Sequence, residues 1–199
     1  AQQRPKLATD KLLALLESEA VTFDRLHDTL NNLGRLRVHV VGDTIVDRYS
    51  YCSLLGQSAK SASFSGRHER SDVFAGGAAI VAKHVQSFGA HVTLTTVLGN
   101  DDLCDFIIDD LTAARVRLRP LVDKGRPTTL KERYIADGQR MLQVDRVDNR
   151  VGSDRLRRTI VQLVHDEPAD VVIFSDFRHG MFHRGAIDEY AAAVRPKVL

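Results

Sequence analysis

The amino-acid sequence predicts an α/β fold built around a mainly parallel sheet. Short β-branched or wholly apolar runs, such as residues 38–41 and 171–175, are typical of strands that are buried on both faces of a sheet. Alanine-rich or amphipathic segments of helical length, such as residues 78–88 and 154–166, lie between these runs. Strands and helices that alternate in this way indicate βα units and therefore parallel strands.

The first 34 residues lie outside this alternation and predict two short helices. Four leucines between residues 12 and 16 form an apolar stripe. A second helix is expected to begin after Thr22, which can act as its N-cap, and to end at Gly34, in the position of a C′ glycine. The pair either packs on the main domain or links it to an upstream segment. We therefore expect residues 1–36 to form an N-terminal helical extension and residues 37–199 to form the main domain.

From residue 37 onward, local signals mark the ends of the predicted elements. Gly42-Asp43 ends the first strand, Gly76-Gly77 begins an alanine-rich helix, and Ser153-Asp154 caps a later helix. In chain order we expect strands at 38–41, 91–97 and 171–175, helices at 78–88, 102–114, 154–166 and 186–194, and the start of a further strand at 197–199.

Two stretches interrupt the alternation. Residues 49–74 and 128–144 are rich in Ser, Thr, Tyr and Phe. The second stretch predicts a β-hairpin, because Asp137-Gly138 is a strong signal for a tight turn. Extended segments inserted between βα units predict a small β-sheet that stands off the main sheet, like a lid.

Composition and charge exclude several classes of protein. The 28 Lys and Arg residues nearly balance the 26 Asp and Glu residues, so the formal net charge is only +2. Binding of nucleic acid or a membrane surface by bulk charge needs a larger excess, so we expect neither partner. No apolar run has membrane-spanning length, and the polar first ten residues lack the apolar core of a signal peptide. The two cysteines are too few for a disulfide framework, which favours a cytoplasmic location.

The strong local motifs of common enzyme classes are absent from the sequence. It contains no P-loop GxxxxGK[ST], GxGxxG, HExxH, CxxC or GxSxG. P-loop hydrolases, dinucleotide-binding oxidoreductases, zinc proteases and serine esterases are therefore disfavoured.

A carboxylate lies just after the first predicted strand, at Asp47, where open α/β sheets bind ligands. Such an acceptor suits the paired hydroxyls of a polyol, because each hydroxyl can donate to one carboxylate oxygen. A helix-capping or turn aspartate is the alternative. Gly76-Gly77 lets the backbone approach a ligand closely, although a plain turn explains a diglycine equally well. The pairing of the two features favours the binding interpretation.

The segment 175–180 follows another apolar strand and is a third candidate. Asp176, His179 and His183 are of types that bind metals, but no further residue of suitable spacing accompanies them, so we expect no metal site. A substrate-facing loop is favoured, and a plain surface loop is the alternative.

Seven short segments carry a resemblance that none of them carries alone. They are Val40-Val41-Gly42-Asp43, Asp47-Arg48-Tyr49, Gly76-Gly77-Ala78-Ala79, Leu98-Gly99-Asn100-Asp101, Thr128-Thr129-Leu130-Lys131, Asp137-Gly138-Gln139 and Ser175-Asp176-Phe177. In this order they resemble the ribokinase/PfkB family of carbohydrate kinases, and more narrowly the heptose-7-phosphate kinase domain of the ADP-heptose pathway. The resemblance runs from about residue 37 to residue 199 and leaves the N-terminal helices outside.

The resemblance implies a Rossmann-like, ribokinase-like domain with a β-sheet lid that phosphorylates a sugar hydroxyl, with ATP and Mg²⁺ as cofactors. The implied partner is a small-molecule sugar phosphate, first of all a heptose phosphate, and some relatives form homodimers through the lid. A lid suits a kinase because excluding water protects ATP from hydrolysis. The implied substrate-binding residues are Asp47 for sugar hydroxyls, Gly76 and Gly77 for backbone contacts, Lys131 and Gln139 on the lid, and Asp176.

Three departures from the family pattern limit what we expect of this chain. Ile80 stands where relatives usually carry an asparagine, and His179 where they usually carry a lysine. The Asn-x-x-Glu and Gly-Ala-Gly-Asp segments, which supply the metal contacts, the anion hole and the catalytic base, would lie beyond Leu199. We therefore expect these residues to be inactive alone, either as part of a longer kinase or as a non-catalytic module for sugar-phosphate binding or assembly.

Overall fold

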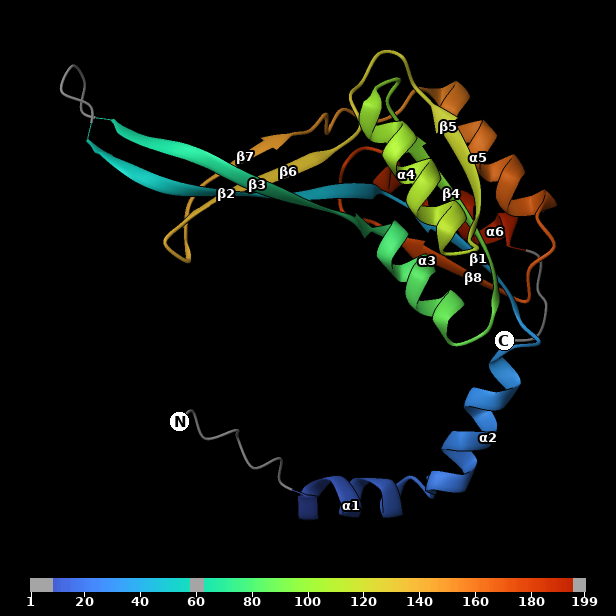
Figure 1. The fold of residues 1–199 in the computed structure, drawn as a ribbon. Helices are drawn as coiled ribbons and strands as arrows, with labels where there is room; N and C mark the ends of the chain where they lie inside the picture. The colour runs from blue at the N-terminus through green and yellow to red at the C-terminus, as the bar shows by residue number, and fades with distance from the viewer. Residues whose placement is uncertain (1–8, 58–62, 195–199) are drawn as a thin grey trace.

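The computed structural model describes residues 9–57 and 63–194, and its main part is a four-stranded parallel sheet (Figure 1). The strands lie in the order β5-β4-β1-β8. Neighbouring strands run parallel, with Val38 of β1 opposite both Val92 of β4 and Val171 of β8. The α/β fold class predicted from the sequence is confirmed. The strand bounds are β1 (Arg37–Gly42), β4 (His91–Leu98), β5 (Arg117–Val122) and β8 (Val171–Ser175).

Helices cover both faces of this sheet. Consecutive residues of a strand point to opposite faces, so Val40 packs in one apolar cluster and Val41 in the other. The first cluster includes side chains of α3 (Ala78–Ser87) and α4 (Asp102–Ala113). The second includes side chains of α5 (Asp154–Asp166), the 3-10 helix η1 (Arg184–Ala186) and α6 (Ile187–Ala193). The predicted N-cap of α5 is confirmed, because Ser153 Oγ accepts a hydrogen bond from the Leu156 N–H at 3.2 Å.

A second four-stranded sheet projects from the main one (Figure 1). Its order is β3-β2-β6-β7, in which β2 is antiparallel to β3 and parallel to β6. The predicted hairpin is confirmed: Asp137 and Gly138 have φ of +50° and +76°, as a tight turn between twisted strands requires. The bounds are β2 (Thr44–Gln57), β3 (Phe64–Gly77), β6 (Leu130–Ala136) and β7 (Gln139–Arg146), so β2 begins directly after β1.

The N-terminal residues form α1 (Thr9–Ser18) and α2 (Phe23–Leu33), which extend away from the sheets (Figure 1). Thr22 caps α2 as predicted, since its Oγ1 accepts from the Arg25 N–H at 3.1 Å. Gly34 has a right-handed φ of −61°, so the expected C′ glycine was wrong. No side chain of α2 is buried, and Phe23 is 72% exposed. The division of the chain at residue 36 stays a prediction, and the strand expected at 197–199 lies outside the described residues.

Within the described ranges, every helix is too short or too polar to span a lipid bilayer.

Candidate functional site

Asp43 joins the three segments that carry the predicted site residues. It lies between β1 and β2, and its backbone N–H donates to the Ser175 carbonyl oxygen at 3.1 Å. Its own carbonyl oxygen accepts from the Ala78 N–H at 2.9 Å, at the start of α3. The ends of β1 and β8 and the entrance of α3 therefore meet where the second sheet begins, at the carboxyl edge of the main sheet. This is the edge at which open α/β sheets bind ligands.

Asp47 and the diglycine lie in direct contact. Antiparallel pairing places Ile45 opposite Gly76 and Thr44 opposite Gly77. A Cβ at Gly76 would overlap Oδ2 of Asp47, so the missing side chain leaves room for that carboxylate. Gly77 has a φ of +59°, and a Cβ there would overlap the Asp43 carbonyl oxygen. Gly76 therefore shapes the site, whereas Gly77 permits the turn into α3.

The structure also brings Lys131 to Asp47 and adds an arginine that the sequence analysis missed. Lys131 lies opposite Asp47 in the β2–β6 pair and opposite Asp145 in the β6–β7 pair. Nη1 of Arg133 donates to Oδ1 of Asp47 at 2.6 Å. This hydrogen bond raises the pKa of Arg133 above its ordinary value, and burial opposes the change. The two-residue period of a strand puts Arg133 on the same face as Lys131, and that spacing was the available signal.

Aromatic rings lie on the same face of the second sheet. The Arg133 guanidinium carbon is 5.2 Å from the centre of the Tyr49 ring. Tyr49 in turn meets the Phe74 ring edge to face, with centroids 6.0 Å apart. Charged hydrogen-bonding groups beside aromatic rings suit a sugar, which presents both hydroxyls and apolar C–H faces.

Asp43 accepts two hydrogen bonds from the loop that carries Asp176. Oδ2 of Asp43 accepts from the backbone N–H groups of Phe177 at 2.9 Å and His179 at 3.3 Å. Oδ1 of the exposed Asp176 accepts from the Arg178 N–H at 2.7 Å, and Arg178 has a left-handed φ of +62°. The Asp43 side chain is buried, and this burial raises its pKa above the ordinary value, although the two backbone hydrogen bonds oppose the rise. Asp43 therefore positions the loop, a role that its place directly after the strand-ending Gly42 could have suggested.

His179 links this loop to the base of the second sheet. Burial lowers its pKa, while the carboxylates of Asp43, Asp145 and Asp176 raise it and the charge of Lys131 lowers it further. The charges of Asp176 and Lys131 therefore both act on His179, and their place in one binding site stays a prediction. His179 Nδ1 is 2.9 Å from Asn149 Oδ1.

No metal cluster is assigned to this region. His183 Nδ1 accepts from the Gly185 N–H at 3.1 Å and so closes the turn that precedes α6. Across the described ranges, no three His, Cys, Asp or Glu side chains are arranged to hold a metal ion.

Gln139 is the predicted site residue that the structure does not bring to the others. It begins β7 at the hairpin tip, opposite Ala136 and exposed. Ala136 is five positions beyond Lys131, which corresponds to roughly 16 Å along a strand. A contact between Gln139 and a ligand on Asp47 would need movement of the sheet.

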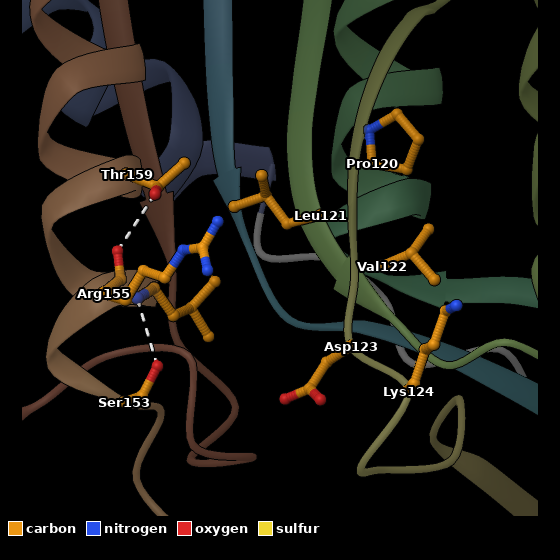
Figure 2. A pocket seen from close by; sticks show the side chains of 9 residues that line it. Pro120, Leu121, Val122, Asp123, Lys124, Ser153, Arg155 and Thr159 are labelled. Atoms are coloured by element: carbon orange, nitrogen blue, oxygen red, sulfur yellow. Dashed lines mark hydrogen bonds between the residues drawn. The ribbon is translucent and has the colours of Figure 1, made fainter.

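A separate pocket of about 550 Å³ lies between β5 and α5 (Figure 2). Lys124 and Arg155 are on opposite walls, and Ser153 caps the helix at its mouth. None of the predicted site residues lines it, so it is distinct from the site at Asp47.

Comparisons with family models and with curated proteins point to the same family. The model of the pfkB family carbohydrate kinases matches residues 35–174. Bifunctional protein HldE of Desulfatibacillum aliphaticivorans is 32% identical over 158 residues, which are 78% of this chain and 32% of that protein. D-beta-D-heptose 7-phosphate kinase of Bordetella bronchiseptica is 32% identical over 154 residues, or 76% of this chain and 49% of that protein. The chain therefore spans about a third of the length of the first of these relatives and about half of the second.

A solved structure supports the same architecture. The ribokinase of Arabidopsis thaliana complexed with ribose and ATP superposes with a TM-score of 0.57 at 19% identity, and the match covers 81% of this chain and 51% of that one. At this identity the likeness concerns the fold, and the expected ribokinase-like architecture is confirmed.

Proposed function

Because the chain belongs to the pfkB family of carbohydrate kinases, we propose that it binds a sugar phosphate, first of all a heptose phosphate, as the substrate of an ATP-dependent kinase. The observation that carries the sugar-binding part is the position of the Asp47 carboxylate directly over Gly76. A half-buried acceptor beside a backbone without side chains is suited to donors that must come close, such as hydroxyl groups.

In this proposal the residues of the chain bind and orient the sugar. Oδ2 of Asp47 accepts a hydroxyl hydrogen bond, and Gly76 leaves the room in which that oxygen lies. Tyr49 and Phe74 cover an apolar face of the ring. The second sheet acts as the lid, which excludes water from the reacting groups.

The described residues include groups suited to a sugar, and no site for ATP with Mg²⁺ is assigned among them. The N–H groups of Phe177 and His179 donate to Asp43, and that of Arg178 donates to Asp176. The loop therefore offers none of these three donors to a nucleotide phosphate. The same ranges contain no arranged cluster of metal-binding side chains. We assign no step of phosphoryl transfer to these residues.

The second candidate function is a non-catalytic module that binds a sugar phosphate. Reading the gene beyond the codon for Leu199 separates the candidates. A Gly-Ala-Gly-Asp segment in the same reading frame supports the kinase, and a stop codon supports the module.

Titration calorimetry with heptose 7-phosphate tests the sugar site for either candidate. We expect Asp47→Ala to weaken binding by about 10-fold to 100-fold, because a hydrogen bond to a charged group contributes about 1.5–3 kcal/mol. The matched control is Asp109→Ala, which removes an exposed carboxylate on α4. Equal affinities for the wild-type chain and Asp47→Ala would contradict the proposal.

A further inference from the structure

The Asp47 carboxylate has two different surroundings. The parallel pairing of β2 and β6 places Asp47 opposite Lys131 and Tyr49 opposite Arg133. Oδ1 of Asp47 accepts from Nη1 of Arg133 at 2.6 Å, across a diagonal of the sheet. Oδ2 lies over Gly76, where no side chain intervenes. One oxygen is therefore bonded to a guanidinium while the other faces the proposed sugar.

The ion pair of Asp47 and Arg133 keeps some contact with water. Their side chains retain 25% and 17% of their exposure, so solvent screens the pair in part and its contribution to stability is modest. The pair lies on a sheet that projects from the main body and not within either apolar cluster. Its position beside the glycine backbone favours a role toward a ligand.

Arg133 has N–H groups that donate no hydrogen bond among the described residues. A guanidinium carries five N–H groups, and a single hydrogen bond from Arg133, to Asp47, is present among the described residues. The remaining donors lie in one plane and match two oxygens of a phosphate or carboxylate group. The charge is permanent, since arginine stays protonated at physiological pH.

The surrounding charges show that geometry, and not an excess of positive charge, would hold an anion here. Lys131 adds a second cation two residues before Arg133, and Asp145 lies opposite Lys131. Together with Asp47, these four groups are balanced in formal charge. An anion would therefore be bound by directed N–H groups, which discriminate by shape.

Resting on the proposed function, we propose that Arg133 is a specificity-determining residue that binds the phosphate of a phosphorylated sugar whose hydroxyls lie on Asp47. A ligand oxygen bonded to Oδ2 lies at most about 7.5 Å from Nη1, which is the sum of two hydrogen-bond lengths and the separation of the carboxylate oxygens. A phosphate a few bonds away on the same sugar therefore reaches the free donors. A neutral sugar bonds to Asp47 but leaves those donors unused.

The test is titration calorimetry of the full 199-residue chain with heptose 7-phosphate and with the same heptose lacking its phosphate. We expect the wild-type chain to prefer the phosphorylated sugar by at least tenfold. Arg133→Met is expected to reduce this preference below threefold, and Arg133→Lys, which keeps the charge but not the planar fork, to leave an intermediate value. The matched control is Arg140→Met, an exposed arginine on β7, which is expected to keep the wild-type preference.

Each outcome decides the question. If the wild-type chain binds both sugars equally, or if Arg133→Met keeps the preference, the inference is overturned while the sugar site stands. If Arg133→Met weakens both sugars by the same factor, Arg133 only orients Asp47, and the inference is again overturned. If the wild-type chain binds neither sugar, the proposed function fails with it. If Arg133→Met does not fold, the preference of Arg133→Lys decides, with a drop of at least threefold expected.

Discussion

Replacing Asp43 by alanine should release the loop that carries Asp176. One carboxylate oxygen of Asp43 accepts two backbone N–H groups, at 2.9 Å from Phe177 and at 3.3 Å from His179. The residue is only 5% exposed, so water cannot easily replace the lost acceptor. Asp43→Ala therefore leaves two amide groups without their partner, on either side of Arg178 with its left-handed φ of +62°.

The expected loss of folding free energy is about 3 kcal/mol. Hydrogen bonds to charged groups contribute about 1.5–3 kcal/mol each, and the length of the second bond argues for the lower end of that range. Burial raises the pKa of Asp43, so the folded protein holds this proton more tightly than the unfolded chain does. Ionisation of Asp43 therefore costs stability as the pH rises through its raised pKa, which offsets part of the gain. Asp43→Asn keeps an acceptor oxygen without a buried charge, and we expect it to cost about 1 kcal/mol or less.

Urea unfolding and amide hydrogen exchange measure the two effects separately. The first gives the free energy of unfolding of the wild-type chain, Asp43→Ala and Asp43→Asn. The second is expected to show faster exchange of the Phe177 and His179 amides in Asp43→Ala, with unchanged exchange in β4. The reasoning would be refuted if Asp43→Asn were as damaging as Asp43→Ala, or if Asp43→Ala changed neither stability nor exchange.

Three further predictions concern single residues of the site and the core. Gly76→Ala should weaken sugar-phosphate binding about tenfold or more and leave the melting temperature nearly unchanged, because the new Cβ displaces only the flexible end of Asp47. A large fall in the melting temperature would contradict this prediction. Gly77→Ala should instead destabilise the chain by about 2 kcal/mol in urea unfolding, since φ is +59° and the Cβ meets backbone; an unchanged midpoint would count against the turn geometry. Burial lowers the pKa of His39 from 6.5 to about 4, so the unfolded state takes up the proton first as the pH falls. Stability should therefore decrease by about 3 kcal/mol between pH 6.5 and pH 4, and His39→Gln should remove most of this dependence, as unfolding measured across that pH range can check.

The sequence determined much of the fold because local patterns report local structure. The apolar runs at β1 and β8 predicted strands that are buried on both faces. The capping residues Thr22 and Ser153 predicted where α2 and α5 begin. The turn signal at Asp137-Gly138 predicted the hairpin of the second sheet. Each of these signals lies within the element that it predicts, so no distant partner is needed to interpret it.

The sequence pattern did not predict strand β5, because the strand lacks a local signal of its own. β5 reads Arg117-Leu-Arg-Pro-Leu-Val122, in which charged residues and a proline interrupt the apolar pattern. Proline is tolerated in a sheet mainly on an edge strand, and β5 is the edge of the main sheet. Its pairing with β4 from Thr93 opposite Arg117 is decided by the neighbour and not by its own composition.

The sequence by itself determined the fold class, the second sheet and the candidates Asp47, Gly76, Gly77, Lys131 and Asp176. Only the tertiary structure decided that Asp47 and Arg133, 86 positions apart, form an ion pair, and that Asp43 holds the Phe177 amide 134 positions away. It also decided that Gln139 lies at the hairpin tip. The roles of these residues in binding a ligand, and dimerisation through the second sheet, stay predictions. The physical reason for the division is that hydrophobic period and capping are properties of neighbouring residues, whereas strand register and buried hydrogen bonds arise only when distant segments pack together.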